Sequence, residues 1–338
     1  MKAIGYQQAH ALGAEQTLTD IELPMPTPAA HDLLVQVNAI SINPVDTKIR
    51  SNASAEANSY KVLGWDAVGV VTAVGSEVSL FEVGDRVWYA GDLTRPGSNA
   101  EFQLVDERIA AKAPNTFSDA EAAALPLTAL TAWELLFDRL QLPAEHATLQ
   151  YLLIVGAAGG VGSIMVQLAK TLTDVTVIAT AGRDASKQWL TELGADYVID
   201  HHQDFAPQLS ALGIDGVQYV ASLNNTDDHI ERIVAALKPQ GKLGLIDDPQ
   251  VFDLKLLKRK SLSLHWEFMY TRSMFSTEDM QRQHDILTEM ASLADNGKIR
   301  TTATERFGSI NAANILRAHE LLESHQARGK IVLSGFED

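Results

Sequence analysis

The first third of the chain consists of short runs in which apolar and polar residues alternate. LLVQVNAISIN (33–43) alternates at its start as a half-buried strand does, and DAVGVVTAVG (66–75) and GDRVWYA (84–90) are further short apolar runs bounded by glycine. Glycine and proline recur at short intervals through this region. The pattern predicts a β-barrel or sandwich rather than a helical domain.

The pattern changes at Ser118. Glu121 follows Ser118 at the spacing of a capping box, which predicts the start of a helix. Pro126 then interrupts the apolar pattern, so we expect two consecutive helices or a kink. From Tyr151 onward, apolar strands alternate with helical segments, which predicts a parallel, doubly wound sheet. The expected strands are 151–155, 175–180, 197–199, 216–222 and 241–246.

A glycine-rich turn, AAGGVG (157–162), follows the first of these strands and opens the next helix. Its spacing matches G-x-G-x-x-G with Ala157 at the first position. The middle glycine lets the backbone approach a pyrophosphate, the last lets the helix pack on the strand, and the helix N-terminus favours phosphate. A tight turn without a ligand is the alternative, but this position favours a dinucleotide. The predicted cofactor-binding residues here are Ala158, Gly159, Gly160, Val161 and Gly162.

The end of the second strand of this region indicates which dinucleotide binds. NAD-binding proteins usually carry an acidic residue there, which accepts a hydrogen bond from the ribose 2′-OH. Here no carboxylate ends the strand and Arg183 follows at once, which suits a 2′-phosphate and predicts NADP(H). Asp184 is the counter-evidence, and we interpret it as the cap of the next helix. The predicted binding residues at this strand end are Thr180, Ala181, Gly182, Arg183 and Lys187.

Composition and charge narrow the function further. The 338 residues include 43 acidic and 27 basic side chains, and the net charge of −16 disfavours nucleic acid and anionic membranes as partners. The N-terminus has no secretory pattern, so cytoplasmic localisation is the expectation. The chain contains no cysteine, which excludes disulfides, thiolate nucleophiles and cysteine-ligated zinc. We therefore predict that no metal is bound.

Several segments together resemble the medium-chain dehydrogenase/reductase superfamily, in particular the zinc-type alcohol dehydrogenase-like proteins of its quinone oxidoreductase branch. The resemblance implies an α/β protein with a GroES-like β-barrel domain over residues 1–125, completed by 300–338. It also implies a doubly wound Rossmann NADP-binding domain over 126–299, and a homodimer whose sheet continues across a two-fold axis near SLSLHWEFMY. The matching segments are SINPVDTKIR, LGWDAVGVVTAVG, VGDRVWYAG, ALPLTALTAWELLFDRL, AAGGVGSIMVQLAK, LGADYVIDH and SLSLHWEFMYTRSMF.

The departures from the family pattern point to the reaction. Zinc enzymes of the superfamily carry an early cysteine and a Gly-His-Glu, whereas this chain has Asn43 and Trp65 at those positions. Reduction of a simple ketone needs a Lewis acid or proton donor at the oxygen. A quinone or an α,β-unsaturated carbonyl spreads the developing charge onto a distant oxygen that hydrogen bonds can stabilise. The sequence thus predicts zinc-independent, NADPH-dependent reduction of such a small-molecule substrate.

The resemblance also implies roles for single residues. Asn43, Asp46 and Lys48 are the candidate catalytic residues, and Lys48 stands where related quinone reductases often have a tyrosine. Asn43 and Asp46 could instead fix the loop after their strand, and Lys48 could be an ordinary surface residue. Tyr60 and Trp65 are either pocket walls or core residues. Three further residues are implied to lie near the cofactor, with ordinary surface or core roles as the alternative: Thr128, His201 and Lys330.

Two other functions stay open at the sequence level. No residue is a clear general acid, so a catalytically quiet NADPH-binding redox sensor or structural protein is the main alternative. A zinc alcohol dehydrogenase is a third hypothesis, and the missing ligands weigh against it. The sequence does not name the physiological substrate.

Overall fold

The computed structural model describes residues 1–14, 17–145 and 147–336. The chain forms two compact units: Met1–Leu130 with Tyr270–Asp338, and Thr131–Met269. The boundaries differ from those expected, since the chain returns to the first unit at Tyr270 rather than near residue 300. The reason is helix α10 (Arg282–Asp295), which packs on strand β8 (Ala110–Lys112) and the short helix η1 (Glu107–Ile109) of the first unit.

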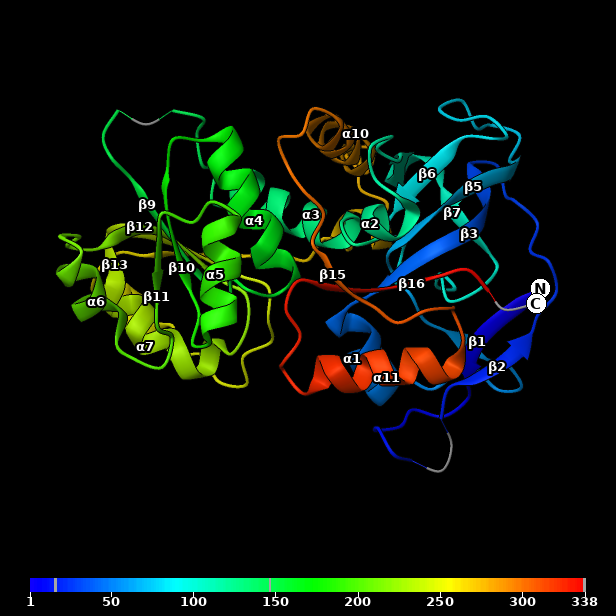
Figure 1. Cartoon of the computed structure of the whole chain (residues 1–338), viewed down its shortest axis with the longest axis horizontal. Helices are drawn as coiled ribbons and strands as arrows, with labels where there is room; N and C mark the ends of the chain where they lie inside the picture. Colours follow the sequence, from blue (N-terminus) through cyan, green and yellow to red (C-terminus); the bar gives the residue numbers. More distant parts are fainter. Residues whose placement is uncertain (15–16, 146, 337–338) are drawn as a thin grey trace. The chain divides into compact units, whose positions relative to one another are not determined.

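The first unit is built around a seven-stranded sheet whose long central strand is β3 (Asp32–Ile42) (Figure 1). β3 pairs antiparallel with β5 (Ala67–Val74), β7 (Phe102–Asp106) and β16 (Lys330–Ser334). β16 comes from the C-terminal tail, so the end of the chain completes the sheet begun by its first third. The remaining strands are β6 (Arg86–Tyr89), β8 and β15 (Ala303–Arg306), and a separate small sheet contains β1 (Lys2–Tyr6), β2 (Thr19–Glu22) and β4 (Lys61–Val62).

The helical signals around Ser118 are confirmed. Glu121 Oε2 accepts a hydrogen bond from the Ser118 backbone nitrogen at 3.0 Å, and Ser118 Oγ accepts one from the Glu121 nitrogen at 3.4 Å. Helix α2 (Asp119–Ala123) begins there, and Pro126 starts a second helix, α3 (Pro126–Trp133), followed by the π-helical η2 (Glu134–Arg139). The boundary between the units falls within α3, so η2 belongs to the second unit. Besides α2, the first unit contains α1 (Pro44–Asn52), α9 (Thr271–Met274), α10 and α11 (Ala312–Glu323).

The stretch Asp119–Arg139 is, by length and composition, apolar enough to cross a membrane. However, 83% of its most apolar window is buried inside the protein. Burial rather than lipid therefore accounts for its composition, as in the core helices of globular proteins.

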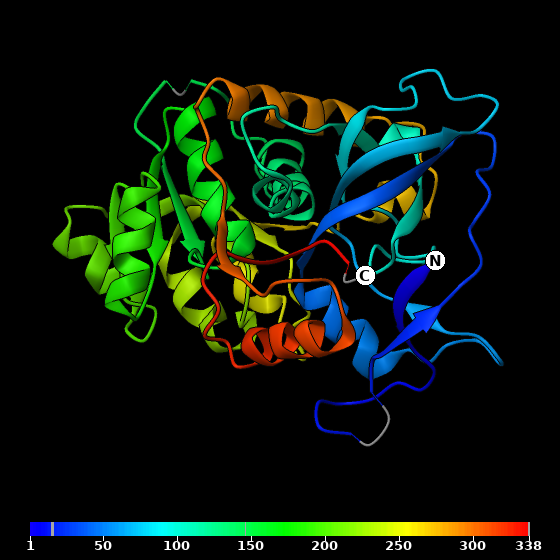
Figure 2. The same cartoon turned by 45° about the vertical axis from the view of Figure 1, so that its right-hand side comes forward.

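The second unit contains the predicted parallel sheet, drawn in green and yellow in Figures 1 and 2. Its strand order is β11-β10-β9-β12-β13-β14. Renumbered within the unit this is 3-2-1-4-5-6, the order of the Rossmann fold. The strands are β9 (Tyr151–Val155), β10 (Thr176–Thr180), β11 (Tyr197–Ile199), β12 (Val217–Ser222), β13 (Leu237–Leu245) and β14 (Ser263–Trp266). The helices are α4 (Gly160–Leu172), α5 (Asp184–Glu192), α6 (Phe205–Ala211), α7 (Thr226–Ala236) and α8 (Lys255–Lys258). The neighbouring strands β9 and β10 carry mostly buried apolar side chains, which is why they read as continuous apolar runs.

Candidate functional site

The junction of β3 and α1 brings two of the predicted catalytic residues together. β3 ends at Ile42, and Pro44 starts α1, so Asn43 is the N-cap between them. The Asn43 backbone nitrogen donates to Asp46 Oδ2 at 2.7 Å. Both side chains are almost wholly buried. The sequence Asn-Pro-Val-Asp thus forms a rigid turn that holds the Asp46 carboxyl inside the unit.

Lys330 reaches the same place from the other end of the chain. β16 pairs with β3 so that Lys330 Nζ lies within 2.9 Å of the Ile42 carbonyl oxygen and 3.0 Å of Asp66 Oδ2, and it also donates to Asn43 Oδ1. Asn43 Nδ2 donates to the same Asp66 oxygen at 2.8 Å. We call Asn43, Asp46, Asp66 and Lys330 the buried lysine cluster.

Asp66 is the member of this cluster that the sequence analysis missed. Its other carboxylate oxygen, Oδ1, accepts a hydrogen bond from the Leu127 backbone nitrogen at 2.7 Å, so the residue also anchors the start of α3. The available signal was an acidic residue directly before the apolar strand β5, in the segment GWD. Its partner is 264 positions away along the chain, which no local pattern reveals.

The cluster holds two carboxyl groups and one ammonium group away from water. Burial raises the pKa of Asp66, and the charge of Lys330 and the Leu127 N–H oppose that rise. Burial also raises the pKa of Asp46 to about 7, against the hydrogen bond from the Asn43 backbone and the charge of Lys330. One ammonium balances one carboxylate, so the second carboxyl, Asp46, gains or loses its proton near neutral pH.

The other predicted residues of this region lie outside the cluster. Lys48 is exposed on α1, whereas Asp46 on the same helix is fully buried. Trp65 is 1% exposed and its Nε1 donates to the Asp92 carbonyl oxygen at 3.2 Å, which makes it a core residue rather than a pocket wall. Tyr60 is 44% exposed. The catalytic role of Lys48 therefore stays a prediction without support from the cluster.

The cluster does not suit zinc. Asn43 of the cluster and Trp65 outside it, which stand at the positions of the family's zinc ligands, offer an amide and an indole, and the Lys330 ammonium has no lone pair to donate to a metal. Across residues 1–14, 17–145 and 147–336, no group of three His, Cys, Asp or Glu side chains is arranged to hold a metal ion. The ammonium supplies the positive charge that the two carboxyl groups face.

The glycine turn of the second unit has the geometry of a phosphate cradle. Gly156 leaves β9 with φ +78°, and Gly159 is the N-cap of α4. A Cβ added to Gly162 would lie 2.3 Å from the Ala157 oxygen, so helix and turn touch. A Cβ at Gly159 would meet nothing closer than 3.6 Å, which leaves its backbone open to a ligand. These residues fit a dinucleotide pyrophosphate at the helix N-terminus.

The end of β10 differs in one detail from the expectation. Arg183, not Asp184, is the N-cap of α5, and Asp184 is the first helical residue with a fully exposed side chain. Thr180 Oγ1 accepts a hydrogen bond from the Gly156 nitrogen at 3.2 Å, tying this strand end to the glycine turn. His201 packs beside Gly182, and so does His202, which the sequence analysis did not select.

Two predicted cofactor residues, Thr128 and Lys330, belong to the first unit. Thr128 is buried and its Oγ1 donates to the Leu125 carbonyl oxygen at 3.0 Å. Lys330 is part of the buried lysine cluster. A role for either residue at the cofactor remains a prediction.

The comparisons with known proteins agree with this architecture. Residues 29–115 match the model of the alcohol dehydrogenase GroES-like domain, and residues 193–333 match that of the zinc-binding dehydrogenase family. The chain belongs to the medium-chain dehydrogenase/reductase superfamily, in a branch that resembles the quinone oxidoreductases. It is an oxidoreductase of that superfamily, with a GroES-like domain and a Rossmann domain.

Individual relatives cover nearly the whole chain. A zinc-type alcohol dehydrogenase-like protein of Staphylococcus aureus is 40% identical over 99% of this chain and 100% of its own. A structure assigned as a zinc-dependent alcohol dehydrogenase from Rhizobium etli has a TM-score of 0.97 and 50% identity, covering 100% of this chain and 99% of its own. The Escherichia coli quinone oxidoreductase complexed with NADPH has a TM-score of 0.82 and 27% identity, with 99% and 100% coverage.

Proposed function

We propose that this protein catalyses NADPH-dependent hydride transfer to quinones or α,β-unsaturated carbonyl compounds without zinc. The buried lysine cluster supports the proposal, because Asn43 stands where the superfamily's zinc enzymes have an early cysteine, and its side chain accepts a hydrogen bond from the Lys330 ammonium, which cannot bind a metal. The similarity to a quinone oxidoreductase that binds NADPH supports both the cofactor and the substrate class. A conjugated acceptor needs no Lewis acid at its oxygen, because hydride adds at carbon and the charge that develops on the distant oxygen can be stabilised by hydrogen bonds.

When bound, NADPH supplies the hydride, and the chain's own groups hold the cofactor and manage the proton. The glycine turn receives the pyrophosphate, and Arg183 with Lys187 suits a 2′-phosphate. Asp46, with its pKa near 7, is partly protonated at neutral pH. We assign Asp46 the role of giving the substrate the proton that it takes up after hydride transfer, with Lys48 as the alternative donor implied by the family resemblance.

The reaction is tested by following NADPH oxidation with a panel of quinones, enones, enals and simple ketones, together with metal analysis of the purified protein. Conjugated acceptors should be reduced, simple alcohols should not be oxidised, and zinc should not be stoichiometric. One zinc per chain whose removal abolishes turnover would contradict the zinc-independent reaction.

Cofactor choice has a separate test. Binding titrations should show NADPH tighter than NADH by at least about tenfold, or roughly 1.4 kcal/mol. Arg183→Ala should narrow that gap, while Arg259→Ala, a control in the loop after α8, should leave it unchanged. Equal affinities of the parent protein for NADPH and NADH would show that the proposed preference for NADPH is wrong.

A catalytically quiet NADPH-binding sensor is the second candidate function. The burial of the buried lysine cluster favours this function, because a side chain that is closed to solvent does not contact a substrate. Asn43, Asp46 and Lys330 are 1%, 0% and 3% exposed. Tight NADPH binding without turnover of any quinone, enone or enal would establish this alternative.

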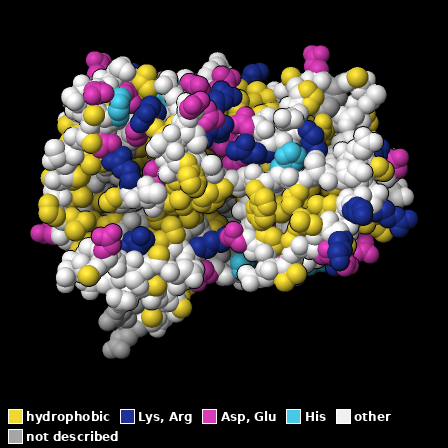
Figure 3. Space-filling model, turned by 180° about the vertical axis from the view of Figure 1, so that it is seen from behind, with side chains coloured by type: hydrophobic (Ala, Val, Ile, Leu, Met, Phe, Trp, Pro, Cys, Tyr) yellow, Lys and Arg dark blue, Asp and Glu magenta, His cyan; other side chains and the backbone are white. Residues whose placement is uncertain are grey.

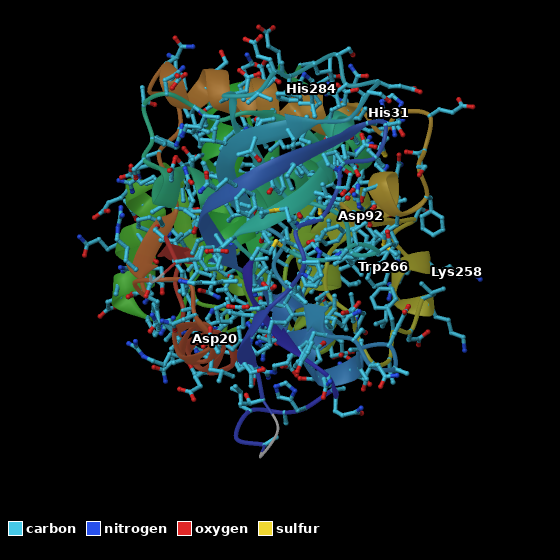
Figure 4. The ribbon with its side chains drawn as sticks, turned by 90° about the vertical axis from the view of Figure 1, so that its right-hand side faces the viewer. Asp20, His31, Asp92, Lys258, Trp266 and His284 are labelled. Atoms are coloured by element: carbon cyan, nitrogen blue, oxygen red, sulfur yellow. The ribbon has the colours of Figure 1, made fainter. Side chains whose placement is uncertain are left out.

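We also propose that the protein is a cytoplasmic homodimer that pairs through β14. This strand is the last in the sheet of the second unit, and Trp266 and Phe268 beside it are 50% and 48% exposed. Apolar side chains gather in patches on the face shown in Figure 3, and Figure 4 shows Trp266 and Lys258 on one flank. Light scattering should give two chains per particle, and Phe268→Asp should produce monomers, whereas Leu149→Asp should not.

A further inference from the structure

Two adjacent histidine rings fill the space beside Gly182 at the end of β10. The ring centroids of His201 and His202 lie 4.2 Å apart. A Cβ added to Gly182 would lie 2.7 Å from His202 Nε2 and 3.1 Å from His201 Cε1. In dinucleotide-binding folds, residues at this strand end contact the adenine ribose of the cofactor. Imidazole edges thus occupy the neighbourhood where an NAD enzyme holds a carboxylate.

The surroundings of the pair are rich in basic groups. The buried His229 ring lies 6.2 Å from His201, and Arg232 Nη1 donates to the His201 carbonyl oxygen at 2.9 Å. The titratable and charged groups around the pair are Asp200 after β11, Arg183, Asp184 and Lys187 on α5, Asp204 before α6, and Asp228, His229 and Arg232 on α7.

Three of the four carboxylates of this set already have a hydrogen-bond or ion-pair partner. Asp200 Oδ1 accepts a hydrogen bond from the His202 backbone nitrogen at 2.9 Å, which lowers the pKa of Asp200. Asp204 lies 3.4 Å from Arg232 Nε, and Asp184 lies 3.7 Å from Lys187 Nζ. The pair is therefore surrounded by four carboxylates and three cationic side chains, and protonation of one histidine makes the numbers of positive and negative charges equal.

The three histidines differ in exposure. Burial, followed by the positive charge of neighbouring groups, lowers the pKa values of both His201 and His229. These two rings stay neutral until the solution is more acidic. His202 is the exposed member of the group. Histidine is the side chain whose charge ordinarily changes between pH 5 and 8.

We propose that His202 is a specificity-determining residue that makes the preference for NADPH depend on pH. Its protonated ring stabilises the 2′-phosphate together with Arg183 and Lys187, and its neutral ring stabilises the phosphate less, because charge-assisted hydrogen bonds are the stronger ones. Selectivity for the phosphorylated cofactor then weakens as pH rises. The proposal rests on the proposed use of NADPH and adds the residue that regulates it.

The test uses adenosine 2′,5′-bisphosphate and 5′-AMP, which differ only in the 2′-phosphate. Calorimetry of the full chain at pH 7, in buffers of different ionisation enthalpy, measures the protons exchanged on binding. We expect uptake with the bisphosphate and none with 5′-AMP. A cationic site without a titrating histidine would give the opposite sign, because it lowers the phosphate pKa, near 6, and releases protons.

Variants assign the proton to one residue. His202→Asn keeps a hydrogen-bonding side chain but cannot titrate, so uptake should disappear. The preference of His202→Asn for the bisphosphate should be roughly fivefold lower than that of the parent at pH 6, where the substitution removes a charged donor. At pH 8 the preference should change little, because the ring that is removed is neutral. The control is His325→Asn, an exposed histidine of the other unit with φ +55°, which asparagine tolerates.

The outcomes separate the two proposals. If the bisphosphate never binds more tightly than 5′-AMP, the NADPH preference itself is wrong. If it binds more tightly but the parent takes up no proton, the preference stands and the role of His202 is wrong. Proton uptake that persists in His202→Asn also overturns the assignment to His202.

Discussion

The first unit buries the cationic side chains of Arg50, Arg272 and Lys330, and the surroundings of Arg50 differ from those of Lys330. Arg50 links α1 to α11: its Nη2 lies 2.5 Å from Glu323 Oε1 and its Nη1 lies 2.9 Å from His319 Nδ1. Lys330 faces the carboxyl groups of Asp46 and Asp66. Both buried charges are paired with hydrogen-bonding partners, but only Lys330 faces a carboxyl group, Asp46, that changes charge near neutral pH.

The partners explain that contrast. Burial, reinforced by the charge of Arg50, lowers the pKa of His319 to about 3, so this ring remains a neutral acceptor through the physiological range. Glu323 is 35% exposed and keeps contact with water. Asp46 has no such contact, and its pKa near 7 lets it exchange a proton under working conditions. A buried cation with fixed partners holds two helices together, whereas one that faces an excess of carboxyl groups creates a proton-exchanging centre.

Removing Lys330 should have the largest effect. Lys330→Met leaves Asp66 and Asp46 without a counter-charge, and breaking a buried pair from one side costs about 3–5 kcal/mol. Urea unfolding should show this loss, and Lys330→Met/Asp66→Asn should recover part of it. If Lys330→Met loses less unfolding free energy than Arg50→Met does, the two buried cations do not differ as proposed.

The pH dependence of stability should have opposite signs at the two centres. The folded pKa of Asp46 is raised, so its contribution is fully present below about pH 4 and is lost as pH rises to about 7. The folded pKa of His319 is depressed, so its neutral form favours folding above about pH 6.5 and that advantage is lost as pH falls to about 3. Asp46→Asn should remove the pH dependence of the unfolding free energy that comes from Asp46, and His319→Gln should remove the part that comes from His319. Each part is on the order of 3 kcal/mol over the pH range given for that residue.

These slopes are measured as differences in unfolding free energy between parent and variant at a series of pH values. A parent-minus-variant difference that does not change with pH would mean that the group titrates alike in the folded and unfolded states.

Arg50→Met should lower stability by about 2 kcal/mol, because hydrogen bonds to charged groups are lost between two helices but no buried carboxylate is stranded. Turnover per folded molecule should stay near the parent value, since Arg50 contacts no member of the buried lysine cluster in the described interactions. A large loss of turnover in fully folded Arg50→Met would mean that Arg50 influences the buried lysine cluster.

Lys48→Met should have the smallest effect on stability, within about 0.5 kcal/mol, as is usual for exposed positions. Lys48 lies between Asp46 and Arg50 in α1 but is exposed. Single-turnover kinetics check its chemistry: slower hydride transfer at unchanged NADPH affinity would give Lys48 the catalytic role that the family resemblance implies.

The sequence by itself determined the parts of this protein that depend on neighbours along the chain. The capping box at Ser118, the break at Pro126, the five strands of the second unit and the glycine turn all follow from local spacing, because cap geometry, proline sterics and strand periodicity act within a few residues. The missing cysteines excluded thiolate chemistry without any structure.

Only the tertiary structure decided which charged groups meet. Lys330 joins Asp66 and Asn43 because β16 pairs with β3, and His229 joins His201 because α7 packs near the end of β11. The place of Asp184 in its helix, the exposure of Lys48 and the membership of α10 in the first unit also required the fold. Burial and long-range pairing set a side chain's environment, and its environment sets its pKa and chemistry, so residues far apart in sequence acquire their roles only when the sheet brings them together.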